Sequence, residues 1–422
     1  MKDGTIRFID VWLGSPLCFL LTCLRRLNDL LHPPKSPASE ARRILFLKLV
    51  EQGATVLAYD AIRRAVDMVG RENIYFCVLE QNRPILDVME LVPPENIFTM
   101  RIDRFSSFLG DAAKTLRRIR QAGIDSIVDM EFFARAPAIF AFLSGAKRRV
   151  GLHRFTAEAP YRGDLMTHRV QYNPHMHIAQ YYAVLVETLA HDSGDVPMLK
   201  APVRGAPPPM PRFAPAAADV DRVRRLLDER LGPLGDPLVL LNPNASDLLP
   251  LRRWPTERFT ALAERILADY ANAAVAVTGA PSERKAAEDL CRTIGSARVA
   301  SLAGETTLRD LLTLYTLADV LITNDSGPGH FSTLTDIDAV VLFGPETPTL
   351  FGPLGSHCHI LRADLACSPC VNALNHRFSP CKNNICMQAI TVDDVYKEVA
   401  RCLSARAEKE RYGARCRETQ NT

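Results

Sequence analysis

The chemically most distinctive stretch of the chain is a polar turn at residues 318–330, which reads Ala-Asp-Val-Leu-Ile-Thr-Asn-Asp-Ser-Gly-Pro-Gly-His. A buried strand is expected to end at Asn324, and Pro328 suits the first turn of a following helix. The turn then presents backbone N–H groups near the positive end of the helix dipole, which predicts an anion site suited to a diphosphate. The candidate residues of this anion site are Asn324, Asp325, Ser326, Gly327, Pro328 and His330. The alternative is a glycine turn that only reverses the chain.

Further polar residues follow other expected strands. We expect the carboxylate of Asp325 to accept hydrogen bonds from loop amides or from a sugar hydroxyl, because it would repel a phosphate. Asn244 and Ser246 follow a strand over 237–241, so they either donate to phosphate or sugar oxygens or cap the next element. A further strand over 274–278 stops at Gly279.

Four cysteines lie within 20 residues, at Cys367, Cys370, Cys381 and Cys386, with the spacing C-x2-C-x10-C-x4-C. Four thiolates so close suit a tetrahedral site for Zn²⁺ or iron. The loop between them is polar and has little core of its own, so a metal would contribute most to its folding there. A reduced metal-free cluster and a pair of disulfides are the alternatives.

Composition limits the classes of protein that remain. The 422 residues are 47% hydrophobic and 23% charged, which is typical of a globular chain of two domains. A net charge of +3 is too small for the basic footprint of a nucleic-acid binder, so no nucleic-acid partner is expected. The odd number of 11 cysteines, mostly single in apolar runs, favours a reducing cytoplasm.

These residues need a scaffold, and strands alternate with helices throughout the chain. In the first half we expect strands near 43–48, 74–79, 124–129 and 149–151, with helices over 55–69 and 105–121. In the second half we expect strands at 237–241, 274–278, 320–323 and 339–343, with helices over 256–270, 282–294 and 308–318. This alternation indicates an α/β fold with two doubly wound parallel sheets, of the Rossmann type, which face a central cleft.

Proline-rich stretches mark the boundaries. Residues 1–40 are expected to form an apolar, amphipathic segment with a linker from His32 to Ser39. An amino-terminal domain at 41–200, a proline-rich linker at 201–218 and a carboxyl-terminal domain at 219–403 follow, the last with the cysteine loop 367–386. A charged tail at 404–422 ends the chain as a frayed helix.

The apolar run at 11–24 is shorter than the roughly 20 residues of a spanning helix. Basic residues follow it more than they precede it, which disfavours a cleavable signal. We expect residues 8–31 to make peripheral contact with a membrane as an interfacial helix or a shallow re-entrant segment. A helix packed on the domain's own surface is the alternative.

Several blocks in the same order resemble glycosyltransferase family 9, the lipopolysaccharide heptosyltransferase family. They are 43–53 (Arg-Ile-Leu-Phe-Leu-Lys-Leu-Val-Glu-Gln-Gly), 252–259 (Arg-Arg-Trp-Pro-Thr-Glu-Arg-Phe), 277–283 (Val-Thr-Gly-Ala-Pro-Ser-Glu), 302–304 (Leu-Ala-Gly), 323–330 and 342–345 (Leu-Phe-Gly-Pro). The resemblance covers about residues 42–400. It implies a fold of the GT-B type, with an acceptor domain first and a nucleotide-sugar domain second.

The resemblance also implies residue roles. Transfer in such folds needs no metal at the diphosphate, since helix amides and a cation take the leaving-group charge. Arg252 matches the family's basic position ahead of Trp-Pro and is the candidate cation; a solvated surface arginine is the alternative. Glu283 matches a position suited to ribose hydroxyls, although an acid in the first turn of a helix also has a structural use.

The acceptor-side loop, with Lys48 and Gly53, departs from the family. Heptosyltransferases carry an aspartate directly after this glycine as the base, and Ala54 stands there. A sugar hydroxyl must still lose its proton, so we expect Glu51 in the same loop to substitute. The alternatives are a base elsewhere or a chain that no longer catalyses.

The resemblance thus implies a cytoplasmic transferase, peripheral to the inner membrane, that moves a sugar to a lipopolysaccharide core or another saccharide or glycolipid acceptor. The sugar expected is a heptose from ADP-heptose. One alternative is a GT-B enzyme that uses a UDP- or GDP-sugar on another glycan or on protein. The other is a catalytically silent nucleotide-sugar-binding scaffold.

Overall fold

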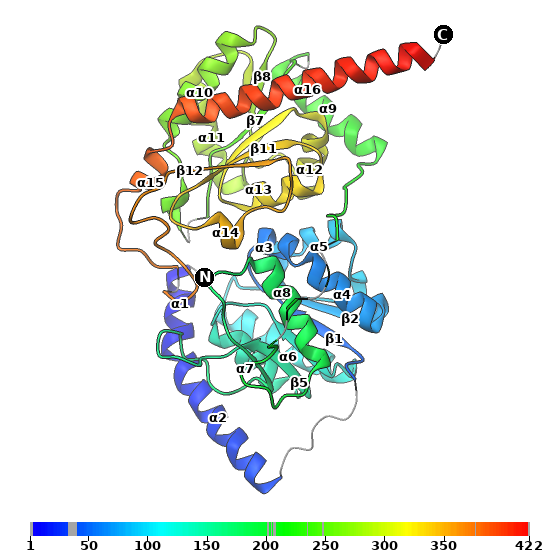
Figure 1. The fold of residues 1–422 in the computed structure, drawn as a ribbon, viewed down its shortest axis with the longest axis vertical. Helices are drawn as coiled ribbons and strands as arrows, with labels where there is room; N and C mark the ends of the chain where they lie inside the picture. Colours follow the sequence, from blue (N-terminus) through cyan, green and yellow to red (C-terminus); the bar gives the residue numbers. More distant parts are fainter. Residues whose placement is uncertain are drawn as a thin grey trace. The chain divides into compact units, whose positions relative to one another are not determined.

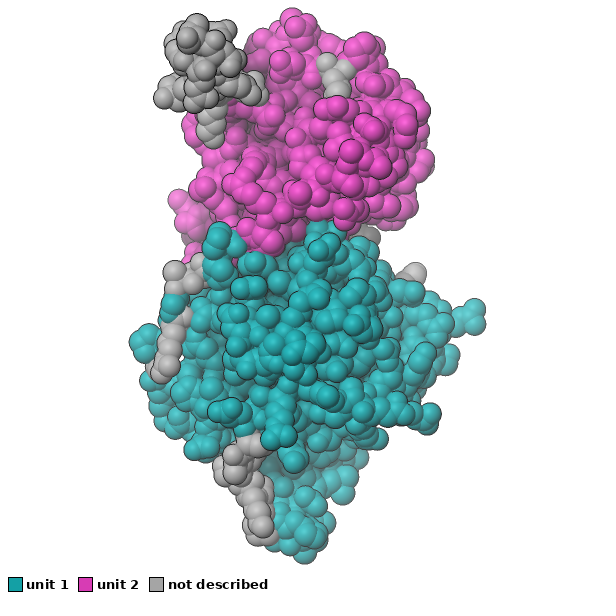
Figure 2. All heavy atoms as spheres, turned by 90° about the vertical axis from the view of Figure 1, so that its right-hand side faces the viewer, with its two compact units in different colours: residues 1–209, 371–378 teal, residues 210–370, 379–422 magenta. Residues whose placement is uncertain are grey.

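A computed structural model describes residues 3–32, 40–200, 202–203, 205, 208–233, 235–246, 249–375 and 377–420. The chain forms two compact units, which Figure 2 shows in different colours. Unit 1 comprises residues up to Pro209 together with Val371–Phe378, and unit 2 comprises Met210–Cys370 and the chain from Ser379 onward. The predicted linker at 32–39 lies outside the described residues except for His32, and four positions of the predicted linker at 201–218 lie outside them as well.

Unit 1 contains a six-stranded parallel sheet in the order β3-β2-β1-β4-β5-β6 (Figure 1). The strands are β1 (Ile44–Leu47), β2 (Ile74–Leu79), β3 (Ile97–Met100), β4 (Ser126–Asp129), β5 (Arg148–Leu152) and β6 (His168–Val170). The helices are α1 (Asp3–Trp12), α2 (Gly14–Leu31), α3 (Gln52–Leu57), α4 (Tyr59–Val69), α5 (Pro84–Met89), α6 (Phe105–Gln121), α7 (Arg135–Leu143) and α8 (Ile178–Glu187).

Unit 2 repeats this topology with the sheet order β12-β11-β10-β7-β8-β9. Its strands are β7 (Leu238–Asn242), β8 (Ala274–Val277), β9 (Val299–Ser301), β10 (Val320–Asn324), β11 (Asp338–Phe343) and β12 (Cys358–Arg362). Its helices are α9 (Ala217–Leu231), α10 (Thr256–Asp269), α11 (Arg284–Ile294), α12 (Leu308–Leu317), α13 (Gly327–Phe331), α14 (Pro348–Phe351), α15 (Ile385–Gln388) and α16 (Val392–Gln420). α10 packs against α11 and α16, while α9 packs against α12 (Figure 1).

The predicted α/β fold with two Rossmann-like domains is confirmed. The buried strands are continuous apolar runs, as expected for parallel strands that are covered on both faces. In each unit the strand order reverses between two neighbouring strands, which are β1 and β4 in unit 1 and β7 and β10 in unit 2. Open α/β sheets bind ligands at the carboxyl ends of such a strand pair.

Two local expectations were wrong. The helix expected over 55–69 is broken after Leu57, because Ala58 has a ψ of 0°. The sequence does not indicate this break, since no glycine or proline lies at it. The apolar amino-terminal stretch was expected to be too short to span a membrane, but the helical segment Phe8–Leu31 has 24 residues and is long and apolar enough by length and composition. Within this segment, the guanidinium of Arg25 is paired with Asp29 and Asp164.

Candidate functional site

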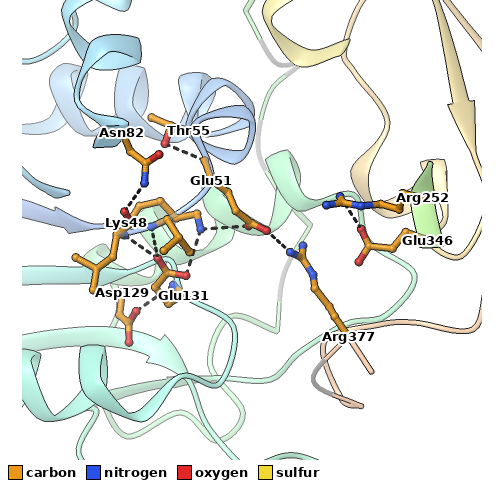
Figure 3. Close-up of polar contacts among 11 residues, drawn as sticks. Lys48, Glu51, Thr55, Asn82, Asp129, Glu131, Arg252, Glu346 and Arg377 are labelled. Carbon is orange, nitrogen blue, oxygen red and sulfur yellow. Dashed lines mark hydrogen bonds and ion pairs between the residues drawn. The ribbon is translucent and has the colours of Figure 1, made fainter. Parts of the chain in front are cut away.

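At the carboxyl ends of β1 and β4, where the strand order of unit 1 reverses, a buried lysine lies between two glutamates (Figure 3). Lys48 directly follows β1 and is fully buried, and its Nζ lies 3.2 Å from Oε2 of Glu131 and 3.5 Å from Oε2 of Glu51. Oε1 of Glu131 accepts hydrogen bonds from the backbone N–H groups of Leu49 (2.7 Å) and Val50 (3.2 Å). A buried charge requires such pairing. Glu131 therefore fixes the loop that carries Lys48 and Glu51.

Glu51 lies where the sequence predicted a catalytic acid, at the start of α3. Its φ of +69° is in the left-handed region, which is uncommon for a residue other than glycine. Its carbonyl accepts from the N–H of Thr55 at 3.2 Å, so the backbone belongs to the helix start. Its carboxylate pairs with Lys48 and with Arg377, which comes from the segment Val371–Phe378. Gly53, the second predicted residue of this loop, is buried within α3.

Behind this group lies a second buried ion pair. Asp129, the last residue of β4, pairs with Arg162, and its Oδ1 accepts from the N–H of Glu131 at 3.0 Å. Burial raises the pKa of the Asp129 carboxyl, and the Arg162 guanidinium opposes this shift. The buried hydroxyl of Tyr182 makes no hydrogen bond among the residues that the structure describes. Burial, then the charges of Glu131 and Glu51, raise the pKa of Tyr182 well above its usual value.

The side chain of Asn324 organises the loops at the carboxyl ends of β7 and β10, where the strand order of unit 2 reverses. This side chain is fully buried at the end of β10. Its Oδ1 accepts from the N–H of Trp254 (3.0 Å), and its Nδ2 donates to the carbonyls of Pro243 (2.9 Å) and Asn244 (3.3 Å). These contacts use both ends of the amide within the protein. Asn324 therefore positions the loops after β7 and β10, although it was predicted to contact the donor itself.

The predicted glycine turn begins α13. Ser326 is the N-cap residue, and its hydroxyl donates to the carbonyl of Asn324 at 3.1 Å. Pro328 lies in the first turn of α13, as predicted. A Cβ on Gly327 would come within 3.0 Å of the Phe331 ring, so the turn requires a close approach that glycine permits. His330 is buried one turn further along.

A close approach also explains Gly279, which follows β8. A Cβ there would lie 2.8 Å from Nδ2 of Asn244 and 3.0 Å from Oε2 of Glu283. Asn244 donates to the carbonyl of Thr278 at 3.4 Å. Glu283 accepts from the N–H of Ala280 at 2.6 Å, which is the structural use considered for this acid. Ser246 lies exposed at the end of the same loop as Asn244.

Arg252 lies beside two buried carboxylates. Its Nη1 is 3.6 Å from Oδ2 of Asp325. The same nitrogen is 3.8 Å from Oε2 of Glu346 (Figure 3). The side chain of Arg252 is only 12% exposed, so it is not a solvated surface arginine. Asp325 thus faces a guanidinium, where the sequence predicted loop amides or a sugar hydroxyl.

The sequence interpretation missed Glu131 and Glu346 as site residues. Glu131 comes two residues after β4 and Glu346 three residues after β11. Their positions at the carboxyl ends of strands were the available signal. Arg377 appeared only as part of a polar loop, because its pairing with Glu51 spans 326 positions.

The four predicted metal-ligating cysteines carry free thiols. Cys386 is buried, Cys370 is partly buried, and Cys367 and Cys381 are exposed. Sγ of Cys370 lies 3.4 Å from Oγ of Ser379, and Sγ of Cys381 lies 3.1 Å from the carbonyl oxygen of Asn383. Burial raises the pKa of Cys386. Among the described residues, no three of these four thiols lie within 4.8 Å of one another, so the predicted metal cluster is not assembled in this structure.

A family comparison decides the classification. The profile of glycosyltransferase family 9 (heptosyltransferase) matches residues 112–378. The chain belongs to glycosyltransferase family 9. This family 9 chain is 30% identical over 172 residues to lipooligosaccharide heptosyltransferase 2 of Campylobacter jejuni, covering 39% of this chain and 51% of that protein. It is 29% identical over 129 residues to lipopolysaccharide heptosyltransferase 2 of Salmonella typhimurium, covering 30% and 36%. It thus spans about half the length of the first of these curated relatives and less of the second.

Solved structures support the fold of this family 9 chain. The Escherichia coli ADP-heptose lipopolysaccharide heptosyltransferase II superposes with a TM-score of 0.65 at 18% identity, covering 86% of this chain and 99% of that one. A family 9 glycosyltransferase from Veillonella parvula gives a TM-score of 0.65 at 17% identity, covering 88% and 99%. Both coverages extend over the two Rossmann-like units.

Proposed function

We propose that this chain is a glycosyltransferase that moves a heptose from ADP-heptose to a lipopolysaccharide core or a related envelope saccharide. The observation that carries the proposal is the gathering of the predicted donor residues at the carboxyl ends of β7, β8 and β10 in unit 2, with Arg252 beside them. Family membership and two relatives that are heptosyltransferases support the reaction class.

Donor binding is assigned to unit 2. The backbone N–H groups of Ser326, Gly327 and Gly329 are the proposed contacts to the diphosphate, while the Ser326 hydroxyl donates to the carbonyl of Asn324. The Arg252 guanidinium takes up the charge of the leaving group. Asp325 and Glu346 hold that guanidinium in place. A preorganised cation of this kind stabilises charge that develops in the transition state and replaces a metal ion at the diphosphate.

Acceptor activation is assigned to Glu51 in unit 1. The acceptor hydroxyl gives its proton to the Glu51 carboxylate while its oxygen forms the bond to the anomeric carbon. The bond from that carbon to the diphosphate oxygen breaks, and its electron pair leaves with ADP. Glu131 is the less accessible of the two acids, because its side chain is buried while that of Glu51 is partly exposed.

The cysteine loop 367–386 is proposed to hold a structural Zn²⁺ or iron ion. Four thiols of one loop match the ligand chemistry of both metals. An iron-containing dodecameric glycosyltransferase from Escherichia coli shares the fold, with a TM-score of 0.50 at 12% identity. A metal here would join the two ends of the segment that carries Arg377.

Localisation to the cytoplasmic face of the inner membrane is proposed from the amino-terminal helices. Cys18, Leu21 and Thr22 of α2 are buried against unit 1. The remaining apolar side chains are exposed, among them Trp12, Phe19, Leu20, Leu24, Leu27 and Leu30. An exposed apolar face of this length on an amphipathic helix is typical of contact with a bilayer.

Separate calorimetric titrations of ADP, UDP and GDP into the full chain test the donor class. Saturable binding that is tightest for ADP is the expected result. Tightest binding of UDP or GDP would overturn the heptose assignment and favour a transferase with another donor. Binding of none of the three would contradict the donor site and favour a silent scaffold.

A further inference from the structure

Three side chains of different elements converge at the amino-terminal edge of the unit 2 sheet. Asp338 is the first residue of β11, His359 is the second residue of β12, and Cys402 lies in α16. One ligand atom from each lies within 4.8 Å of the other two. Because the proposed donor residues follow the carboxyl ends of the strands, this group lies at the opposite edge of the same sheet.

The contacts of His359 assign a different role to each ring nitrogen. Nε2 lies 3.1 Å from Oδ1 of Asp338 and is the ring atom on the side of that carboxylate. Nδ1 lies 3.1 Å from Oε1 of Glu398, one turn before Cys402 on α16. In metal sites, the histidine nitrogen that does not bind the metal usually donates to a carboxylate, which orients the ring. Glu398 lies at that nitrogen and can accept from it once Arg401, which donates to the same nitrogen at 2.8 Å, pairs with Glu398 alone.

Arg401 completes the arrangement from the outside. Its Nη2 lies 2.6 Å from Oε1 of Glu398 and 2.8 Å from Nδ1 of His359. The guanidinium therefore neutralises Glu398, which would otherwise add a third negative charge beside Asp338 and an ionised Cys402. One carboxylate and one thiolate would then match the two positive charges of a divalent ion.

We propose that Asp338, His359 and Cys402 form a second metal site, separate from the cysteine loop, for a divalent transition metal ion. The mixed oxygen, nitrogen and sulfur donors fit Zn²⁺ best, since carboxylate, imidazole and thiolate are its usual protein ligands. Cys402 is buried and the other two residues are partly buried, so solvent can supply a fourth ligand. The role is structural, because the ion would fasten α16 to the ends of two parallel strands.

The competing explanation is a metal-free salt bridge. In it, Arg401 pairs with Glu398 and donates to Nδ1 of a neutral His359, whose Nε2 donates to Asp338. Cys402 separates the explanations, because a buried thiol adds nothing to a salt bridge but supplies a third ligand to a metal.

The experiment is zinc loading of the metal-stripped full chain. Bound zinc per chain is measured by elemental analysis after dialysis, and thermal unfolding is followed with and without ZnCl₂. The variants are Cys402→Ser and His359→Gln. The matched control is Cys358→Ser, which removes a partly buried thiol at the neighbouring position of β12, where Sγ lies 3.6 Å from Oγ of Ser332. Circular dichroism establishes that each variant is folded.

We expect Cys402→Ser and His359→Gln each to bind one zinc fewer than the wild type, and to lose part of the rise in Tm that zinc gives the wild type. Cys358→Ser should bind as much zinc as the wild type and show the same rise in Tm. Glu398→Gln should weaken zinc binding at this site by about 10–100-fold. If the wild type, Cys402→Ser and His359→Gln bind the same amount of zinc with the same rise in Tm, the site does not exist and the salt bridge is the correct explanation. Should Cys402→Ser fail to fold, His359→Gln decides alone.

Discussion

Arg377 pairs with the carboxylate of Glu51, which precedes it by 326 positions in the chain. Both residues have left-handed backbone conformations, with φ of +53° and +69°. Each such conformation costs of order 1 kcal/mol and persists only where the surroundings enforce it. The contact therefore holds Arg377 against the loop after β1. An acceptor hydroxyl that reaches Glu51 must exchange with, or share, the contact to Arg377.

Glu51→Gln tests the proposed base. The amide keeps the size of the side chain but cannot take a proton, so turnover should fall by about 10²–10⁴-fold. The Kd for ADP should stay unchanged, because the donor residues belong to unit 2. Transfer is measured by ADP release with acceptor present, and binding by calorimetry.

Glu90→Gln is the matched control for Glu51→Gln. Glu90 also has a left-handed φ, of +53°, at the end of a short helix, and it is exposed. Its substitution should leave turnover and ADP binding as they are. Full turnover by Glu51→Gln with intact ADP binding would exclude Glu51 as the base.

Glu131→Ala should destabilise unit 1 by about 3–5 kcal/mol. The substitution leaves buried Lys48 with one partner fewer and removes the acceptor for two backbone N–H groups, and breaking one side of a buried pair typically costs that much. Urea unfolding measures the loss. Glu95→Ala, at an exposed position of the same unit, should change stability by less than about 0.5 kcal/mol. Equal unfolding midpoints of the two variants would contradict the role assigned to Glu131.

The central strands and long helices were predictable because their pattern is local. The strand Ile74–Leu79 and the helix Phe105–Gln121 have the predicted bounds, since each is a continuous apolar or amphipathic run between clear breaks. β3, β6, β9 and β12 were missed. β6 and β9 have only three residues each, and β6 and β12 mix polar with apolar residues, so pairing with an already formed sheet selects these strands.

The site was predictable only where a strand end and a glycine coincide. Ser326 and Gly279 were found this way. Glu131 lies in no recognisable motif, and its importance comes from the burial of Lys48, which no local pattern indicates. Arg377 depends on a contact across most of the chain. Sequence alone therefore located the loops but not the partners that hold them.

Gly279→Ala should weaken ADP binding by about tenfold, about 1.4 kcal/mol of binding free energy. The added Cβ would lie 2.8 Å from Nδ2 of Asn244, so that side chain must leave the carbonyl of Thr278. Calorimetry measures the affinity. Gly110→Ala is the control, because nothing lies within 4 Å of a Cβ there. It should stabilise α6 by about 1 kcal/mol and leave ADP binding unchanged. Unchanged ADP affinity in Gly279→Ala would remove Asn244 from the donor site.

Alkylation tests the metal proposed for the cysteine loop. In the native metal-free chain, iodoacetamide should modify the exposed Cys367 and Cys381 but not Cys77, because burial raises the pKa of Cys77 to about 12. Added Zn²⁺ should protect Cys367 and Cys381 while Cys23, exposed on α2, still reacts. Peptide mass spectrometry measures the extent of alkylation at each cysteine. Equal labelling with and without Zn²⁺ or Fe²⁺ would contradict a metal at this loop.

Two pairs of exposed apolar residues separate membrane contact from ordinary surface exposure. Leu20 and Leu24 lie four positions apart on α2, and Phe105 and Leu109 lie four apart on α6. Leu20→Glu with Leu24→Glu removes apolar area that a bilayer would bury, at about 1.5–3 kcal/mol per side chain, and adds charge that anionic lipid repels. Binding to vesicles with anionic lipid, measured by flotation, should fall by at least about tenfold. Phe105→Glu with Leu109→Glu should float like the wild type. Equal flotation of both double variants would show that α2 does not contact lipid, and its apolar face would then belong to the protein's own surface.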